Sequence, residues 1–475
     1  MTTPKSNDIC DATATELVSM IRDRAVSPVE VTRAFLERIE RVNPKINAYV
    51  TITADQAMAQ AGEAGRRVMT HAPSELPPLL GVPVSIKDLS RTAGVRTTFG
   101  SRAFADHIPD CDDEVVTRVL GAGAIMLGKT NTPEFGLHGT TEESLFGPTR
   151  NPWDLKRSAG GSSGGAAAAL AARLCPLAEG SDGGGSIRGP AACCGIVGLK
   201  PARARVPVAP LVGEAWAGLA TSGPMARSVA DVTLGLDVMA GPALADPYPT
   251  ALPDRSFSSA LTDARQPRRV AWSASHPAFA VAPDVAEAVE RAAQALRERG
   301  HDLVEAFPDT SGMWQPFLTI IDAHTAAIDV PNADLLMPHA RAVFEAGGRL
   351  PAVDYLAAEQ AMYRGSRRIL AWFQDVDALL CPTLTRTAPL LGEMAGTGME
   401  VWKKLEGFIP FEFWVNMAGL PAISLPLAWK DDGVPIGVQL VGRPLGDRTV
   451  LALAGELEEA FPWRDRTPFL QDHPV

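Results

Sequence analysis

The chain has 475 residues, 46% hydrophobic and 21% charged, a composition that excludes a disordered polymer and predicts a large buried core. Its formal net charge of −11 argues against nucleic acid and anionic membranes as partners, because like charges repel. The most apolar stretch, 166–178, contains Arg173 and is too short to span a bilayer. Residues 1–8 hold no apolar run, so we expect a cytoplasmic protein without a signal peptide.

The first seventy residues are predicted to be mainly helical. Residues 11–42 have the apolar spacing of two helices, and the second begins at the capping box Ser27–Glu30. We expect that helix to break at Asn43-Pro44, because the residue before a proline avoids the helical conformation. A short strand over 48–52 and an alanine-rich helix over 53–69 follow.

From residue 77 onward the pattern changes to alternating strands and helices. Strands are predicted over 81–88, 124–129 and 174–179, and helices over 115–122 and 166–172. This alternation with short turns is typical of a layered α/β domain.

The second half of the chain is less regular. Residues 225–300 return to helical periodicity, whereas residues around 300–415 mix aromatics, prolines and glycines, as expected of a variable cap over a substrate pocket. Paired strands are predicted over 421–427 and 437–442, before a closing helix over 449–460. We find no repeat or linker and therefore expect a single domain over 1–475.

Two glycine-rich segments hold the candidate functional residues. Residues 158–165 read SAGGSSGG and residues 183–186 read GGGS. A phosphate-binding loop would need GxxxxGK[ST], but Gly165 is followed by Ala166. A dinucleotide-binding GxGxxG is not matched either, although Asp182 lies at a suitable distance for its acidic residue.

A serine hydrolase with a histidine base is the next alternative. Residues 160–164 fit GxSxG, but the preceding 151–157 are predicted to be a polar loop rather than a buried strand. The eight histidines are scattered, no HxxxH or HxE pair occurs, and none of the six cysteines forms CxxC. We therefore expect no metal and no cofactor, and a serine nucleophile here would need a base other than histidine.

A lysine could be that base. A catalytic lysine must be neutral, so its pKa has to fall from about 10.4 to about 7–8 through burial. Lys87 follows an apolar strand that would carry it inward. Taken alone, a lysine after a strand is more often a surface residue.

Several motifs together resemble the amidase signature family. They are Lys87-Asp88, the GGSSGG run, GSDGGGSIR over 180–188, GLKP over 198–201, and NMAGLP over 416–421. Ser162 follows Lys87 by 75 positions and Ser186 follows Ser162 by 24, as in that family. The similarity is strongest over 75–230, whereas residues 240–410 are essentially unmatched.

The resemblance implies a fold and a set of catalytic roles. The fold would be a single large α/β/α domain whose central, mostly parallel or mixed twisted sheet is covered by helices. Ser186 would be the nucleophile, Ser162 a proton relay after a cis peptide bond, and Lys87 the base. Further residues implied are the backbone N–H groups of Gly183, Gly184 and Gly185 as an oxyanion hole, and Ser163, Asp182 and Arg188 as orienting residues.

The chain departs from the family pattern at two positions. Ser181 stands where the family commonly has threonine, and Gly183 stands where it has a larger residue. Both changes leave the backbone donors in place. They therefore concern the shape of the pocket more than the chemistry.

The sequence leaves the substrate open. Candidate pocket residues are Phe135, Leu137, Phe411, Phe413, Trp414 and Asn416. They suggest a small aryl or alkyl amide, with an aryl or alkyl carbamate or ester as the alternative. The second alternative, the glutaminase subunit of a tRNA-dependent amidotransferase, is disfavoured because residues 202–224 do not resemble the corresponding stretch. We expect a small-molecule substrate and a monomer or homodimer, without nucleic acid or membrane partners.

Overall fold

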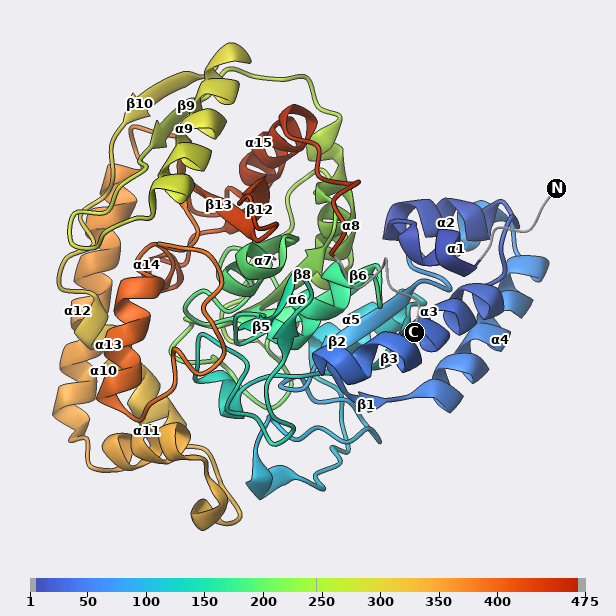
Figure 1. Cartoon of the computed structure of the whole chain (residues 1–475), viewed down its shortest axis with the longest axis horizontal. Coiled ribbons are helices and arrows are strands. Elements are labelled where there is room, and N and C mark those ends of the chain that lie inside the picture. The colour runs from blue at the N-terminus through green and yellow to red at the C-terminus, as the bar shows by residue number, and fades with distance from the viewer. Residues whose placement is uncertain (1–5, 245, 469–475) are drawn as a thin grey trace.

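The computed structural model describes residues 6–244 and 246–468 (Figure 1), whose strands form one large mixed sheet and a separate two-stranded one. The strands are β1 Tyr49–Ile52, β2 Pro83–Lys87, β3 Ile125–Thr130, β4 Arg150–Asn151, β5 Asp154–Ser158, β6 Leu177–Asp182, β7 Val197–Lys200, β8 Thr221–Ala226, β9 Arg269–Trp272, β10 Asp302–Glu305, β11 Ala378–Pro382, β12 Ala422–Trp429 and β13 Pro435–Gly442. The large sheet has eleven strands in the order β1-β3-β2-β6-β8-β7-β12-β13-β11-β9-β10.

The eleven-stranded sheet confirms the predicted α/β class in its mixed form. Strand β2 runs parallel to both β3 and β6, whereas β8, β7, β12 and β13 pair antiparallel in succession. The predicted pairing of the last two strands is confirmed as β12 with β13. Because parallel strands end at the same edge of a sheet, β2 and β6 deliver their carboxyl-terminal residues to one place.

Helices cover the sheet along its length. The α-helices are α1 Ser6–Asp11, α2 Ala14–Arg22, α3 Pro28–Ile46, α4 Ala54–Thr70, α5 Glu114–Gly121, α6 Gly164–Ala171, α7 Arg188–Cys194, α8 Val229–Met239, α9 Pro283–Glu298, α10 Trp314–Ala326, α11 Pro338–Gly348, α12 Ala352–Trp372, α13 Met399–Phe408, α14 Phe413–Met417 and α15 Asp447–Ala460. None of them, in the part of the chain that the structure describes, is long and apolar enough to cross a membrane.

Helix α3 shows one prediction that was right and one that was wrong. Its capping box is confirmed, since Ser27 N–H donates to Glu30 Oε2 at 2.8 Å and Glu30 N–H donates to Ser27 Oγ at 3.1 Å. The break expected at Asn43-Pro44 is wrong, because the helix continues to Ile46. Pro44 lies in the last turn, where it removes only one hydrogen bond, and Asn47 ends the helix with a φ of +53°.

Two segments that were predicted to have another structure contain strands. Residues 151–157, predicted as a polar loop, belong largely to the hairpin of β4 and β5. Within 225–300, predicted as helical, β9 pairs with β10 and β11 through the apolar pair Val270 and Ala271. Strands of two to five residues are too short to produce a readable alternation of polar and apolar residues.

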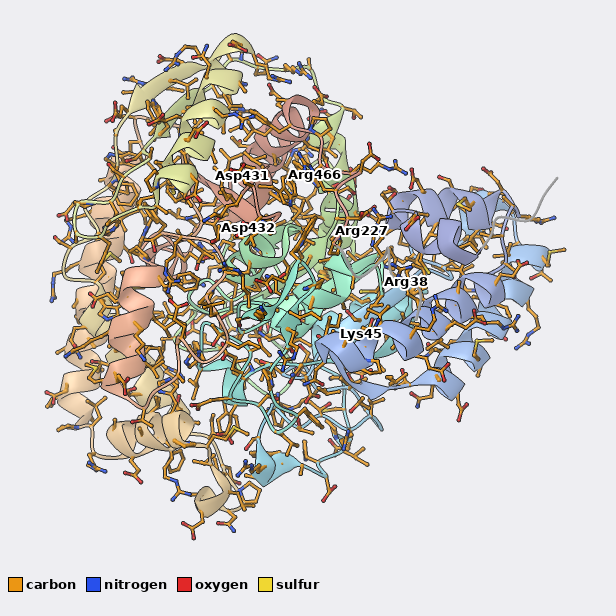
Figure 2. All side chains as sticks on the ribbon, in the orientation of Figure 1. Arg38, Lys45, Arg227, Asp431, Asp432 and Arg466 are labelled. Carbon is orange, nitrogen blue, oxygen red and sulfur yellow. The ribbon has the colours of Figure 1, made fainter. Side chains whose placement is uncertain are left out.

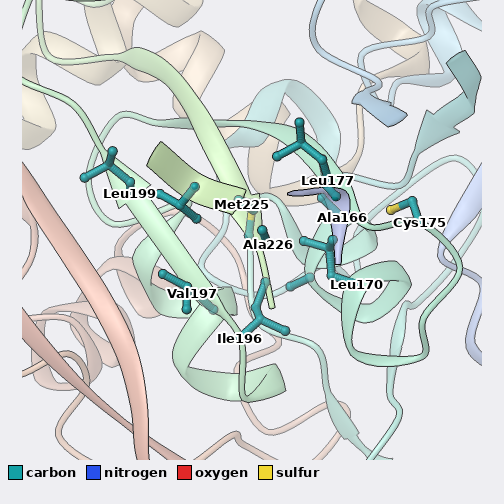
Figure 3. Close-up of a cluster of buried hydrophobic side chains, with 14 of the residues drawn as sticks. Ala166, Leu170, Cys175, Leu177, Ile196, Val197, Leu199, Met225 and Ala226 are labelled. Atoms are coloured by element: carbon teal, nitrogen blue, oxygen red, sulfur yellow. The ribbon is translucent and has the colours of Figure 1, made fainter. Parts of the chain in front are cut away.

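Helix α6, which follows the first glycine-rich segment, consists almost entirely of glycine and alanine and packs into a core of larger apolar side chains. Figure 3 shows Ala166 and Leu170 of α6 packed near Leu177 of β6 and Met225 of β8. Helix α6 is buried along its whole length. Gly165 permits this close packing, because a Cβ there would lie 2.3 Å from the backbone nitrogen of Asn131.

The N-terminal helices are fastened to the rest of the chain by two arginines that Figure 2 labels. Arg38 of α3 donates through Nε to the carbonyl oxygen of Ala172 at 3.0 Å. Arg227 donates to the carbonyl oxygens of Cys175 at 3.1 Å and Ala12 at 2.6 Å. The two guanidinium groups therefore donate hydrogen bonds to backbone carbonyl groups that follow α6, and Arg227 also donates to one that precedes α2.

The region predicted as a variable cap holds helices α10 to α14, which lie on the opposite side of the molecule from α1 to α4 (Figure 1). The same region contains β11, which returns to the large sheet between β13 and β9. Residues 300–415 therefore contribute to the large sheet itself. They do not form a simple insertion beside it.

Candidate active site

The candidate catalytic residues come together at the ends of β2 and β6. Lys87 is the last residue of β2, and Asp182 is the last residue of β6. Ser162 and Ser163 directly precede α6, and Ser186 lies in the turn between β6 and α7. Residues that are far apart in the sequence thus meet at one edge of the sheet.

Lys87 is fully buried and points at Ser162. Its Nζ lies 2.7 Å from Ser162 Oγ, and it also contacts Ser181 Oγ at 3.0 Å and the Ser181 carbonyl oxygen at 3.3 Å. Burial lowers the pKa of Lys87 to about 7, although the carboxylates of Glu179 and Asp182 oppose the shift. In a large fraction of the molecules the Lys87 amine is therefore unprotonated near pH 7.

Glu179 fixes the backbone beneath the lysine. Its carboxyl group accepts the Lys87 backbone N–H at 3.0 Å and the Ser90 hydroxyl at 3.0 Å. Burial raises the pKa of Glu179 above its ordinary value, although these hydrogen bonds and Lys87 act in the opposite direction. Glu179 was not singled out in the sequence, where it is one acidic residue inside an apolar strand.

Ser162 and Ser186 share one cavity. The Gly161–Ser162 peptide bond is cis, as the family resemblance implies. Both serines line a cavity of about 630 Å³, called here the wide cavity, whose walls also include Phe99, Phe135 and Trp216. Within the described residues no hydrogen bond joins the two hydroxyls. Ser163 ties the two segments together, because its N–H donates to the Ser186 carbonyl oxygen at 3.1 Å.

Asp182 and Arg188 form a fully buried ion pair beneath the turn that carries Ser186. Arg188 Nε and Nη2 donate to the two carboxylate oxygens of Asp182 at 3.0 and 3.1 Å. Burial alone would raise the pKa of Asp182, but Arg188 holds it well below its usual range. Asp182 also accepts the N–H groups of Gly185 at 2.7 Å and Ile187 at 3.1 Å, so the pair shapes the turn.

The three predicted glycine donors differ in what they do. The N–H groups of Gly183, Gly184 and Ser186 find no acceptor among the described residues, which leaves them available to a ligand. Gly185 differs from the expectation, because its N–H is already occupied by Asp182. An oxyanion hole built from this turn would therefore use Gly183, Gly184 and Ser186.

The predicted pocket residues divide into two groups. Phe135 lines the wide cavity, and Leu137 lines a second cavity of about 40 Å³, called here the narrow cavity. Phe413, Trp414 and Asn416, which were also predicted as pocket residues, belong to α14 and line neither of these two cavities. Phe411, also considered, is buried and packs against Phe307 and His276, and it lines neither of these cavities.

The three residues of α14 support the site from behind. Phe413 packs against Trp314 and Phe317 with ring centres 4.9 and 5.5 Å apart, and Trp414 packs against Phe307. Asn416 accepts from Arg188 Nη2 at 2.6 Å and donates to Asp182 Oδ1 at 2.9 Å. Asn416 is thus part of the ion-pair network.

Glycine at 183 and 184 makes room for aromatic rings that the sequence analysis did not identify. A Cβ at Gly183 would lie 2.7 Å from the ring of Trp216, and one at Gly184 would lie 2.6 Å from the ring of Phe317. The larger residue that the family commonly has at position 183 would displace Trp216. Only the pairing of a glycine with a distant aromatic residue could have revealed this, and a single sequence does not show such pairs.

No group of three or more metal-binding side chains lies close enough to hold an ion within the residues described.

Known proteins resemble this chain over nearly its whole length. It is 38% identical over 471 residues to an acylamidase of Rhodococcus erythropolis, covering 96% of each chain. It is 36% identical over 473 residues to a glutamyl-tRNA(Gln) amidotransferase subunit of Thermosynechococcus vestitus, covering 94% of this chain and 97% of the relative. The solved structure of 6-aminohexanoate cyclic dimer hydrolase superimposes with a TM-score of 0.91 and 33% identity, covering 97% of this chain and 99% of that one.

Fold, site and relatives together define a hydrolase that acts on amide C–N bonds. The family model described as Amidase matches residues 30–451. The chain therefore belongs to the amidase family, the family of amidase signature enzymes, as its motifs had suggested.

Proposed function

We propose that this protein is a serine amidohydrolase that cleaves small aryl or alkyl amides through an acyl-enzyme on Ser186. The observation that carries the proposal is the 2.7 Å contact of the buried Lys87 Nζ with Ser162 Oγ. Ser162 and Ser186 both line the wide cavity beside this contact. A neutral lysine in this place can take a proton from Ser162, which can in turn take one from Ser186.

Acylation begins when Ser186 Oγ attacks the carbonyl carbon of the amide. The Ser186 proton passes to Ser162 Oγ while the Ser162 proton passes to Lys87 Nζ. The negative charge that develops on the carbonyl oxygen is stabilised by the free N–H groups of Gly183, Gly184 and Ser186. The C–N bond then breaks, the nitrogen takes a proton from Ser162, and Lys87 returns its proton to Ser162.

Deacylation repeats these steps with water. A water molecule attacks the ester carbonyl on Ser186 and loses a proton through Ser162 to Lys87. The C–O bond to Ser186 breaks, and the serine oxygen regains a proton by the same route. The carboxylic acid leaves, and Lys87 is again neutral.

The pH dependence of the rate follows from the requirement for a neutral lysine. Because the pKa of Lys87 is about 7, kcat/KM should be constant above about pH 8 and fall about tenfold per pH unit below about pH 6. The measurement is kcat/KM on a p-nitroanilide from pH 5 to 9. Samples returned to pH 8 should recover full activity, which separates titration from unfolding. A flat profile with chemistry limiting would contradict the role of Lys87.

The wide cavity supports an aryl amine as the leaving group. Phe99, Phe104, Phe135 and Trp216 give it an aromatic wall that suits a flat ring. Carbamates and esters present the same carbonyl group and remain the alternative substrates. Initial rates on matched anilides, aryl carbamates and aryl esters test this, each compared with the uncatalysed rate of the same substrate, and an anilide rate no higher than its own uncatalysed rate would overturn the amide assignment.

A glutaminase role is the second candidate, favoured by the 36% identity to an amidotransferase subunit. The purified chain alone should hydrolyse p-nitroacetanilide and release no ammonia from glutamine. The opposite pattern would favour the glutaminase.

A further inference from the structure

The narrow cavity lies directly against the proposed nucleophile. Ser186 and Gly184 form part of its wall, and most of the rest is apolar, including Leu137, Phe317, Trp402 and Phe408. Its volume of about 40 Å³ corresponds to roughly three water-sized positions, at about 10–15 Å³ each. It therefore suits a short substituent.

One carboxyl group interrupts this apolar lining. Glu412 is fully buried, and neither of its carboxyl oxygens has a hydrogen-bond partner among the described residues. Its Oε2 lies only 2.2 Å from where a Cβ would stand at Gly185, which has a φ of +124°. Because Gly185 has no side chain, it leaves room for the Glu412 carboxyl group and can also adopt the positive φ of the turn.

The surrounding charges leave Glu412 without a counterion. Arg188 reaches the Glu412 backbone oxygen at 3.2 Å, but its side-chain donors go to Asp182, Gln439 and Asn416. His138, on the same cavity, is neutral, because burial lowers its pKa to about 3. Burial raises the pKa of Glu412 well above its ordinary value, although Arg188 acts in the opposite direction. A buried polar group without a partner is costly, and a ligand that supplies one gains that energy.

The position of Ser162 shows which part of a substrate would meet Glu412. In the proposed mechanism Ser162 protonates the leaving nitrogen, so the amine must lie on its side. Ser162 lines the wide cavity but not the narrow one, whereas Ser186 lines both. The amine therefore occupies the wide cavity, and the acyl group extends into the narrow cavity.

We propose that the narrow cavity selects a short acyl group ending in an N–H donor, an ammonium or a carboxamide, which hydrogen-bonds to Glu412. This inference rests on the proposed acyl-enzyme and adds to it the class of acyl group. An ammonium would also lie against the aromatic rings of Phe317 and Trp402. A carboxamide would pair its N–H and C=O with a protonated carboxyl group.

Three p-nitroanilides of similar acyl length test the proposal on the unaltered protein. Butyryl ends in a methyl group, β-alanyl in an ammonium and malonamoyl in a carboxamide. We expect at least one donor-bearing substrate to exceed the butyryl compound in kcat/KM by about 100-fold, the scale set by an unsatisfied buried polar group. A preference for β-alanyl identifies an ammonium site and one for malonamoyl an amide site. Equal rates, or a preference for butyryl, would overturn the proposal.

Variants at Glu412 then assign the selectivity to this residue. In Glu412→Leu the ratio of kcat/KM for the preferred donor substrate over butyryl should fall at least about 100-fold. Glu412→Gln keeps an acceptor and a donor, so it should preserve more of a carboxamide preference than of an ammonium preference. An equal loss on all three substrates would show a structural role and refute the inference.

The failure of the proposed function would look different. Ser186→Ala should abolish hydrolysis of all three anilides, and turnover that survives in this variant would refute the acyl-enzyme. The substrate ratios of the unaltered protein would still report whether a donor is preferred.

Discussion

Lys87→Ala is expected to lower kcat on an anilide by about 10³-fold or more, within the range typical of losing a general base. The Nζ group is the partner of Ser162 at 2.7 Å, and no other side-chain amine contacts that hydroxyl in the described structure. The measurement is kcat per mole of folded enzyme, with folding checked by circular dichroism.

Lys129→Met is the matched control for this loss. Lys129 is also fully buried, lies in the neighbouring strand β3, and has a pKa lowered to about 8 by burial. Its Nζ donates to the Ser90 carbonyl, to Thr92 Oγ1 and to Thr97 Oγ1, and it does not line either cavity. This variant should lose stability while its folded fraction keeps kcat. Full activity in Lys87→Ala would disprove the proposed relay.

Arg188→Met should lower the free energy of unfolding by about 3–5 kcal/mol, the cost of leaving a buried charge unpaired. Asp182 would lose both of its guanidinium contacts in a fully buried place. Because Asp182 holds the N–H groups of Gly185 and Ile187, the turn that carries Ser186 should also loosen and kcat should fall. Urea unfolding and anilide turnover measure the two effects.

Arg205→Met is the control that separates the loss of stability from the loss of turnover expected in Arg188→Met. Arg205 pairs with Asp447 in a second buried ion pair, with Nη2 and Oδ2 3.2 Å apart, away from both cavities. It should cost comparable stability and leave the turnover of the folded fraction intact. Arg188→Met losing less than about 1 kcal/mol would contradict the importance assigned to its pair.

The elements that the sequence predicts best are those with long periodicity or strong boundary signals. The start of helix α3 is predicted by the capping box of Ser27 and Glu30. The α/β class is predicted by the alternation of strands and helices around β2, β3 and β6. The end of α3 was misplaced because Asn43 caps the chain from within the helix, accepting the N–H groups of Ala48 and Tyr49.

Those residues of the candidate site that lie in sequence motifs could be predicted, whereas those that lie outside any motif could not. Lys87, Ser162 and Ser186 are indicated by the resemblance of their motifs and spacings to the amidase signature family, and the structure gives the 2.7 Å contact between the first two. Glu412 has no motif, and its only signal is a charged residue inside the apolar stretch 409–415. Part of the wall of the narrow cavity comes from α10 and α13, whose approach to the turn at 183–186 depends on packing over more than a hundred residues.

Asn416 has a consequence for how substrate preference can change during evolution. Its side-chain amide joins Asp182, Arg188 and the Leu219 carbonyl oxygen, so it fixes the end of the region around 300–415 to the proposed catalytic turn. Side chains on α10 and α13 can therefore be exchanged to reshape the narrow cavity while Asn416 still holds the Asp182–Arg188 pair beneath the turn that carries Ser186. We expect a library that varies those helices and keeps Asn416 to yield new acyl preferences far more often than one that varies Asn416 itself.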